Sequence, residues 1–496
     1  MRKVFIWTAR IVAFIACLAA LIWAVFLTMD MVSEHRIRAI AKRVPSAYVK
    51  VQSSTLVLDH VRVIDGTGAA PAEDQSIVIE AGKISYAGPR SKQPQIPEAK
   101  VLDLSGRTVL PGLVGMHEHL FMPAPSQCQQ HLLVEQSTLF PLMYLAAGVT
   151  TIRTAGSIAP ERDLAVKQKI DQGVAVGPEM FLTAPYLEGE PPTFPEMHGL
   201  ANAQEARRAV DDWADRGMTS FKAYMNITSD ELQEAVKAAH SHGLKITGHL
   251  CRVGFREAAE LGIDNLEHGV LTDTEFYSKK QASLCPDFRF FLSEYNTQLN
   301  ISSPAVQNVI RYLISHHVAI TSTLAVVESE FGTSRPKEDL QRASQAMTWK
   351  AWRASRQRVE MVPHSRVDNL MRKEMDFERD FVKMGGTLLA GCDPTGDGST
   401  LAGFGDQREV ELLVGAGFTP VEAIRIATKN GADFLGIADR VGTVSAGKQA
   451  DLIVVNGDPA TNIPDIEKVE FVFQKGVGYD PVKLLDGIHG VVGLEN

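Results

Sequence analysis

The stretch LVGMHEHL at residues 113–120 marks the point where the pattern of the chain changes. Before it, short apolar runs lie between Gly, Pro and Asp turns, which is typical of antiparallel strands. From it onwards, short apolar runs alternate with helical patterns. We expect strands at 113–120, 148–156, 179–187, 218–225, 244–251, 264–270, 317–326 and 387–395. Eight strands with intervening helices predict an α/β fold, the parallel (β/α)8 TIM barrel.

The segments on either side of this barrel both have the pattern of β-strands. The N-terminal runs are 55–66, 76–88 and 100–110, and the C-terminal runs are 441–459 and 468–479. The simplest interpretation is that both flanks build one small β-sandwich domain. The predicted organisation is a linker at 30–54, a composite β domain at 55–112 and 437–480, a barrel at 113–436 and a C-terminal tail at 481–496.

Helices are expected between the strands. The segment SDELQEAVKAAHSHG at 229–243 has a helical pattern, with Ser229 or Asp230 as its expected N-cap. A further helix is expected at 419–436, after the last barrel strand. Two insertions, 271–316 and 327–380, flank the seventh strand and could not be assigned to the barrel.

The N-terminus contains 19 residues without a charge, from Ile11 to Met29. That length is enough for a helix to cross a bilayer. We expect residues 1–29 to be a single-pass transmembrane anchor or an uncleaved signal; a cleaved signal peptide is the competing interpretation. Basic residues stand on both sides of the span and do not determine its orientation. Because N-terminal signal anchors usually translocate the domain that follows, we expect an extracytoplasmic (periplasmic) catalytic domain.

Composition excludes some classes of protein. The chain of 496 residues is 45% hydrophobic and 22% charged, which is ordinary for a globular protein. A net charge of −9 argues against a nucleic-acid partner. The five cysteines are widely spaced and contain no CxxC, so a disulfide scaffold is not expected. One bridge among the last four is compatible with the sequence, which does not determine the pairing.

Polar residues stand near the C-terminal ends of five predicted strands, where the chemistry of a parallel barrel takes place. Imidazole and carboxylate are ligands for zinc and similar divalent ions. Taken singly, each residue has an ordinary structural explanation, such as a hydrogen-bonded buried histidine, a turn aspartate or an ion-paired lysine. Together they favour a metal site over separate structural roles. The candidate ligands are His117, His119, Lys222, His249, His268 and Asp393.

Lys222 lies within the largely apolar stretch GMTSFKAYMN at 217–226, although lysine is seldom buried without a partner. Four histidines and one aspartate exceed what a single four-coordinate zinc needs, so two metals fit better. A lysine carboxylated by CO₂ would supply an anionic bridge between them. Burial beside cations lowers the pKa of a lysine and favours the neutral amine that this reaction requires. We therefore expect two divalent ions, Zn²⁺ being the expected metal, and N6-carboxylated Lys222.

The chain resembles the amidohydrolase superfamily over roughly residues 55–480. The resemblance is carried by segments 61–88 and 101–119, by LEHG at 266–269, by GCDP at 391–394 and by GTVSAGKQADLIVVNGDP at 442–459. It implies that His117 and His119 bind the more buried metal and that His249 and His268 bind the more exposed one. It also implies that Lys222 bridges both metals. Asp393 would bind the buried metal and act as general base on a metal-bridging hydroxide.

Within the superfamily, the form FKAY is similar to the Xaa-Pro dipeptidase-like branch. That resemblance implies that Tyr224 and His131 bind the carboxylate of a substrate. Their structural alternatives are a core aromatic and a surface helix residue. Arg153, near the end of the second strand, either pairs with a substrate carboxylate or with a neighbouring acid.

The expected activity is hydrolysis of a C–N amide bond in a dipeptide or N-acyl amino acid with a free carboxylate. The alternatives are a cyclic-amide hydrolase or a deaminase of the same superfamily, and a non-catalytic membrane-anchored barrel. A deaminase would need no bridging lysine, and a non-catalytic relative would be expected to lose ligands. The expected partners are a small-molecule substrate and, through residues 11–29, a membrane. A homo-oligomer is compatible with the sequence, which does not determine the oligomeric state.

Overall fold

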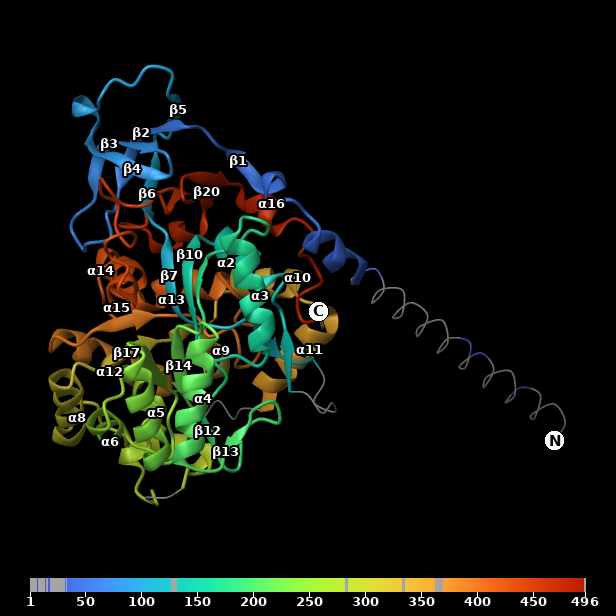
Figure 1. The fold of residues 1–496 in the computed structure, drawn as a ribbon, viewed down its shortest axis with the longest axis vertical. Coiled ribbons are helices and arrows are strands. Elements are labelled where there is room, and N and C mark those ends of the chain that lie inside the picture. The colour runs from blue at the N-terminus through green and yellow to red at the C-terminus, as the bar shows by residue number, and fades with distance from the viewer. Residues whose placement is uncertain are drawn as a thin grey trace.

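The computed structural model describes residues 34–494, except 126–131, 282–283, 332–334 and 362–368, together with the single residues 7, 14, 17 and 32. Its centre is the predicted parallel barrel (Figure 1). All eight predicted barrel strands are present, although each is shorter than expected. They are β7 (Leu113–Glu118), β10 (Val149–Thr154), β11 (Glu179–Phe181), β14 (Ser220–Ala223), β15 (Lys245–Gly248), β16 (Asn265–Glu267), β17 (Ala319–Ser322) and β18 (Leu388–Ala390).

The barrel closes through single bridges as well as continuous ladders. Strands β7, β10 and β11 pair in parallel, and so do β14 to β18 in order. The two groups join where Thr183 and Leu187 bridge Ser220 and Ala223. They join again after β18, where the backbone N–H of Asp393 donates to the carbonyl oxygen of His117 at 2.9 Å. Gly391 permits this approach, because a Cβ at that position would lie 2.3 Å from the backbone nitrogen of His117.

Helices surround the barrel and form most of the two insertions. They are α2 (Phe140–Ala146), α3 (Pro160–Asp171), α4 (Ala203–Asp215), α5 (Ser229–Ser241), α6 (Phe255–Glu260), α7 (Phe288–Gln298), α8 (Pro304–Ser315), α9 (Leu324–Phe331), α10 (Lys337–Ala346), α11 (Trp349–Met361), α12 (Leu370–Lys383), α13 (Phe404–Gly415), α14 (Pro420–Arg425) and α15 (Gly431–Leu435). The first insertion carries α7 and α8. The second carries α10, α11, most of α12 and the end of α9.

The expected N-cap of α5 was wrong by one or two residues. Thr228, not Ser229 or Asp230, caps the helix. Its backbone is extended, and its hydroxyl accepts a hydrogen bond from the N–H of Glu231. The Glu231 carboxylate in turn accepts from the N–H of Thr228, which completes a capping box.

Both flanks of the barrel contribute strands to one β sheet. In Figure 1 the N-terminal strands, in blue, lie beside the C-terminal strands, in red. The flanks meet where β19 (Leu452–Asn456) pairs antiparallel with β6 (Arg107–Pro111). Hydrogen bonding runs through one branched nine-stranded sheet rather than two separate sheets. Its strands are β1 (Val49–Val51), β2 (Thr55–Val63), β3 (Ala72–Glu80), β4 (Lys83–Pro89), β5 (Lys100–Asp103), β6 (Arg107–Pro111), β19 (Leu452–Asn456), β20 (Val469–Gln474) and β21 (Val477–Tyr479).

Four shorter strands form two small ladders outside these sheets. They are β8 (Phe121–Pro123), which pairs with β9 (Leu133–Glu135), and β12 (Glu188–Gly189), which pairs with β13 (Gly199–Leu200).

The segments expected to be a linker and a tail are folded onto the molecule. Residues 34–41 are helical, and Ile37 and Ile40 on this helix are buried. Arg43 pairs with Asp486 at 2.8 Å, and β1 joins the β sheet. The C-terminal segment forms α16 (Pro481–Leu485) and buries apolar residues further on. The two ends of the described chain are therefore held together by apolar packing and an ion pair.

No helix in the part of the chain that the structure describes is long and apolar enough to cross a membrane. The predicted span at residues 11–29 lies outside the described residues, apart from the isolated Phe14 and Cys17.

Candidate active site

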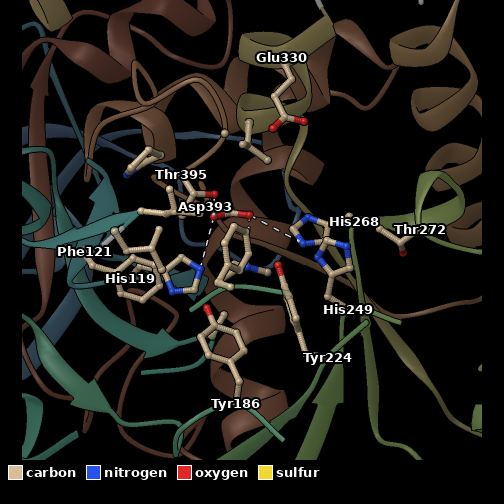
Figure 2. Close-up of a pocket in the computed structure, with 18 of the residues that line it drawn as sticks. His119, Phe121, Tyr186, Tyr224, His249, His268, Thr272, Glu330, Asp393 and Thr395 are labelled. Carbon is tan, nitrogen blue, oxygen red and sulfur yellow. Dashed lines mark hydrogen bonds and ion pairs between the residues drawn. The ribbon is translucent and has the colours of Figure 1, made fainter. Parts of the chain in front are cut away.

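The six predicted metal ligands line one cavity of about 540 Å³. His117 belongs to β7 and Lys222 to β14, and the other four follow directly or closely after the C-terminal ends of β7, β15, β16 and β18. Five of the side chains are buried and His249 is half-buried. Figure 2 shows Asp393 near the centre of this cavity, with His119 on one side and His249 and His268 on the other. The polar ends of five separate strands therefore meet as the sequence predicted.

Asp393 is close to three histidines. Its carboxylate oxygens lie 3.4 Å from Nε2 of His117, 3.4 Å from Nε2 of His119 and 3.8 Å from Nε2 of His268. One ligand atom from each of His117, His268 and Asp393 lies within 4.8 Å of the others. Burial alone would raise the pKa of Asp393, but the three imidazoles outweigh this effect and hold the pKa well below its usual range.

Two of these residues have a backbone conformation that side chains other than glycine rarely adopt. The φ angles are 62° at His268 and 47° at Asp393, both in the left-handed region. Backbone hydrogen bonds hold both residues, from His268 N–H to Thr321 and from Asp393 N–H to His117. The strain directs both side chains into the cavity, and such strain is common where function requires a fixed geometry.

Glu267 is a site residue for which the sequence analysis predicted no role. It is fully buried, and one of its carboxylate oxygens lies 2.8 Å from Nδ1 of His117. The other accepts a hydrogen bond from Arg153 at 2.8 Å and lies 3.8 Å from Nζ of Lys222. This contact turns Nε2 of His117 toward Asp393, as carboxylates commonly do for metal-binding histidines. Alternation along a strand would place Glu267 opposite His268, but the left-handed φ of His268 brings both side chains inward.

Arg153 is not positioned to bind a substrate carboxylate in this cavity. Its side chain is buried in the barrel, where it donates hydrogen bonds to Asn265 at 2.7 Å and Glu267 at 2.8 Å. It is not among the residues that line the cavity. The alternative of a neighbouring acid is therefore the one observed, because the inward face of β10 points at β16.

The donor atoms fit a metal centre. Nζ of Lys222 and Nδ1 of His119 are buried and have no hydrogen-bond partner among the described residues. Burial lowers the pKa of Lys222 to about 8, although Glu267 and Asp393 oppose the shift. Burial, with Lys222 nearby, also lowers the pKa of His117 to about 4 and that of His249 to about 3. Neutral imidazoles are the form that binds metal ions, and a neutral amine is the form that reacts with CO₂.

Aromatic and apolar side chains form most of the remaining cavity wall. Tyr224 lines the cavity, and its ring centroid lies 5.0 Å from that of His249 and 4.9 Å from that of Tyr186. His131 lies outside the described residues. The sequence did not point to five further polar residues of the wall, because they come from loops or insertion helices. These are Tyr186, Thr272, Glu330, Arg358 and Thr395.

Solved structures similar to this chain support the fold. The crystal structure of a Xaa-Pro dipeptidase with bound methionine matches with a TM-score of 0.65 and 20% identity, over 86% of this chain and 100% of that chain. A putative prolidase from Bifidobacterium longum matches with a TM-score of 0.63 and 22% identity, over 88% and 99% of the two chains.

Sequence relatives match over shorter segments. A 5-methylthioadenosine/S-adenosylhomocysteine deaminase from Symbiobacterium thermophilum is 43% identical over 68 residues, which are 14% of this chain and 16% of that protein. An imidazolonepropionase from Paracoccus denitrificans is 28% identical over 128 residues, which are 24% of this chain and 32% of that protein. The matches thus span less than a third of each relative's length.

The model of the amidohydrolase family, in contrast, matches residues 108–287 and 361–478, more than half of the chain. The match, together with the barrel and its cluster of candidate ligands, means that this chain belongs to the amidohydrolase family.

Proposed function

We propose that the protein is a binuclear-metal amidohydrolase that cleaves the C–N amide bond of a dipeptide or N-acyl amino acid with a free carboxylate. The observation that carries this proposal is the amine of Lys222. It is buried at the end of β14 among candidate ligands, and no described residue hydrogen-bonds to it. A buried amine without a hydrogen-bond partner is costly to the folded protein, even with the Glu267 carboxylate 3.8 Å away. Carboxylation would turn it into a ligand that bridges two cations.

The proposed ligands divide into two groups around Lys222. His117, His119 and Asp393 would hold the more buried ion, and His249 and His268 the more exposed one. Bound divalent ions would polarise the amide carbonyl and make water a better nucleophile at neutral pH. His117 and His119 are the two histidines nearest to Asp393, at 3.4 Å each, while His268 lies 3.8 Å from it.

The chain's own residues would position the substrate and move the proton. Asp393, which its histidine neighbours keep ionised, would accept a proton from the attacking water and deliver it to the departing nitrogen. Tyr224, together with His131, would bind the carboxylate of the substrate. The apolar and aromatic walls, which include Phe121 and Phe194, would exclude water from the reacting bond.

The test is hydrolysis of a library of dipeptides and N-acyl amino acids by the full-length, zinc-loaded protein in detergent. About two equivalents of metal and release of free amino acid are expected. Lys222→Ala should lose metal and activity, with partial rescue by short-chain carboxylic acids that imitate the carbamate. Lys237→Ala, at an exposed position of α5, is the matched control and should behave as the wild type. Full activity of unrescued Lys222→Ala would contradict the bridging role, and release of ammonia from purines or pyrimidines would favour a deaminase.

We also propose that residues 11–29 anchor the enzyme and that its barrel lies outside the cytoplasm. The disulfide between Cys251 and Cys285 supports this location, because disulfides persist mainly in oxidising compartments. It joins the loop after β15 to the first insertion. Protease added to intact spheroplasts should digest the barrel; complete protection of the barrel, with digestion only after lysis, would contradict the proposal.

A further inference from the structure

Glu330 is an acidic side chain in the cavity wall that the proposed chemistry does not use. It lies near the C-terminal end of α9 and is partly buried. Among the described residues, none forms a hydrogen bond or ion pair with its carboxylate. Glu328 on the same helix is different, because it pairs with Arg408 at 2.7 Å and does not line the cavity. Of these two acids, only Glu330 is available to a bound molecule.

The surroundings of Glu330 are apolar or anionic. Val326, Val327 and Phe331 of the same helix line the cavity beside it. Gly396, in the loop after β18, leaves room for its side chain, since a Cβ there would lie 3.2 Å from Cγ of Glu330. Burial raises the pKa of Glu330 to about 8, and the charges of Asp393 and Asp397 add to the effect. An unpaired carboxylate in such surroundings is unfavourable, and a cation bound beside it would remove the cost.

No side chain among the residues that the structure describes supplies that cation. Arg358 of α11 also lines the cavity, but its guanidinium donates to the backbone carbonyl oxygens of Ala124 at 2.8 Å and Asp397 at 3.5 Å. The carboxylate of Asp397 pairs with Arg356 at 2.7 Å. Among the described residues of the cavity wall, the only lysine is Lys222, which lies 3.8 Å from Glu267 in the barrel.

The position of Glu330 indicates which part of a substrate it would meet. In the view of Figure 2, Glu330 and Tyr224 lie on opposite sides of Asp393. A substrate with its reacting amide at Asp393 and its carboxylate toward Tyr224 would extend its acyl portion toward α9. Glu330 would then face the acyl side of the scissile bond.

We propose that Glu330 is a specificity-determining residue that binds a cationic group on the acyl side of the scissile bond. This inference rests on the proposed amide hydrolysis and adds the charge of the preferred substrate. The cation is either the α-ammonium of a dipeptide or the charged side chain of a basic acyl residue. Both present the same N–H donors to the carboxylate, and a charge-assisted pair in a desolvated site contributes strongly to recognition.

The test compares three substrates that share a C-terminal leucine. Norleucyl-leucine carries only the α-ammonium, N-acetyl-lysyl-leucine carries only the side-chain cation, and N-acetyl-norleucyl-leucine carries neither. The wild type should have a kcat/KM at least tenfold higher for one of the two cationic substrates than for the neutral one. Glu330→Gln should remove that preference and leave kcat/KM for the neutral substrate within about twofold. The substrate that loses most identifies the source of the cation.

Two further variants keep the result interpretable. Glu338→Gln, at an exposed position of α10, removes one negative charge outside the cavity and should change none of the three values. Glu330→Lys should raise kcat/KM for N-succinyl-norleucyl-leucine, whose acyl end is anionic. Equal losses on all three substrates, or no preference in the wild type, would overturn the role of Glu330 while leaving amide hydrolysis intact. If the wild type cleaves no substrate, both the proposed function and this inference are wrong.

Discussion

Replacing Lys222 by methionine is expected to stabilise the metal-free protein and to abolish its activity. Burial lowers the pKa of this amine from 10.5 to about 8, and no described residue hydrogen-bonds to it. The charged amine therefore opposes folding at neutral pH. The cost is about 3 kcal/mol, because each tenfold change in proton affinity corresponds to about 1.4 kcal/mol. Methionine has a similar length and no charge, so it should fill the same space without this cost.

The stabilisation should depend on pH in a defined direction. Between about pH 8 and pH 10.5, the unfolded chain still binds the proton of Lys222 while the folded protein has released it. The contribution of Lys222 to the free energy of unfolding of the wild type should therefore rise with pH through this range. The advantage of Lys222→Met should be complete below about pH 8 and should shrink as the pH approaches 10.5.

The measurement is urea unfolding of chelator-treated proteins, followed by circular dichroism at pH 7 and pH 9. At pH 7 the variant should be more stable than the wild type by about 2 to 3 kcal/mol, with a smaller difference at pH 9. Zinc reloading should restore activity to the wild type only. Lys237→Met on α5 is the control, and an exposed substitution of this kind should change stability by less than about 0.5 kcal/mol. A variant less stable than the wild type at pH 7 would refute the reasoning, since the amine would then be satisfied in the folded protein.

Further changes probe the other parts of the site and the fold. Asp393→Asn should keep the fold but lose turnover, because the amide cannot accept the proton; wild-type rates would rule out Asp393 as the base. Glu267→Gln removes the carboxylate beside His117 and should lower zinc affinity about 10- to 100-fold, as measured by competition with a chromogenic chelator. Unchanged affinity would mean that Glu267 does not position His117. Cys251→Ser should lower the free energy of unfolding by about 3 to 4 kcal/mol, as expected for a bridge that closes a loop of 34 residues. Equal stability of this variant and the oxidised wild type would show that the bridge to Cys285 is dispensable.

The sequence alone determined the barrel and its main chemical residues, because both depend on local patterns. Short apolar runs that alternate with helical segments specify parallel strands, and the C-terminal ends of such strands meet at one face. A polar residue at the end of an apolar run, such as His249 or Asp393, is therefore visible without coordinates. The composite β domain was also predictable. The segments on both sides of the barrel have the pattern of β-strands, and one domain built from both is the simplest arrangement.

Tertiary structure alone decided which partners these residues have. Arg153 has the charge to bind a substrate, but the inward face of β10 directs it to Glu267. The pairing of Cys251 with Cys285 depends on where the first insertion folds back. Glu330 and Arg358 reach the cavity on helices of the second insertion, and no strand pattern predicts where such helices pack. Local sequence periodicity specifies the direction of a side chain relative to its own strand or helix, whereas the neighbour it meets depends on contacts between segments distant in the chain.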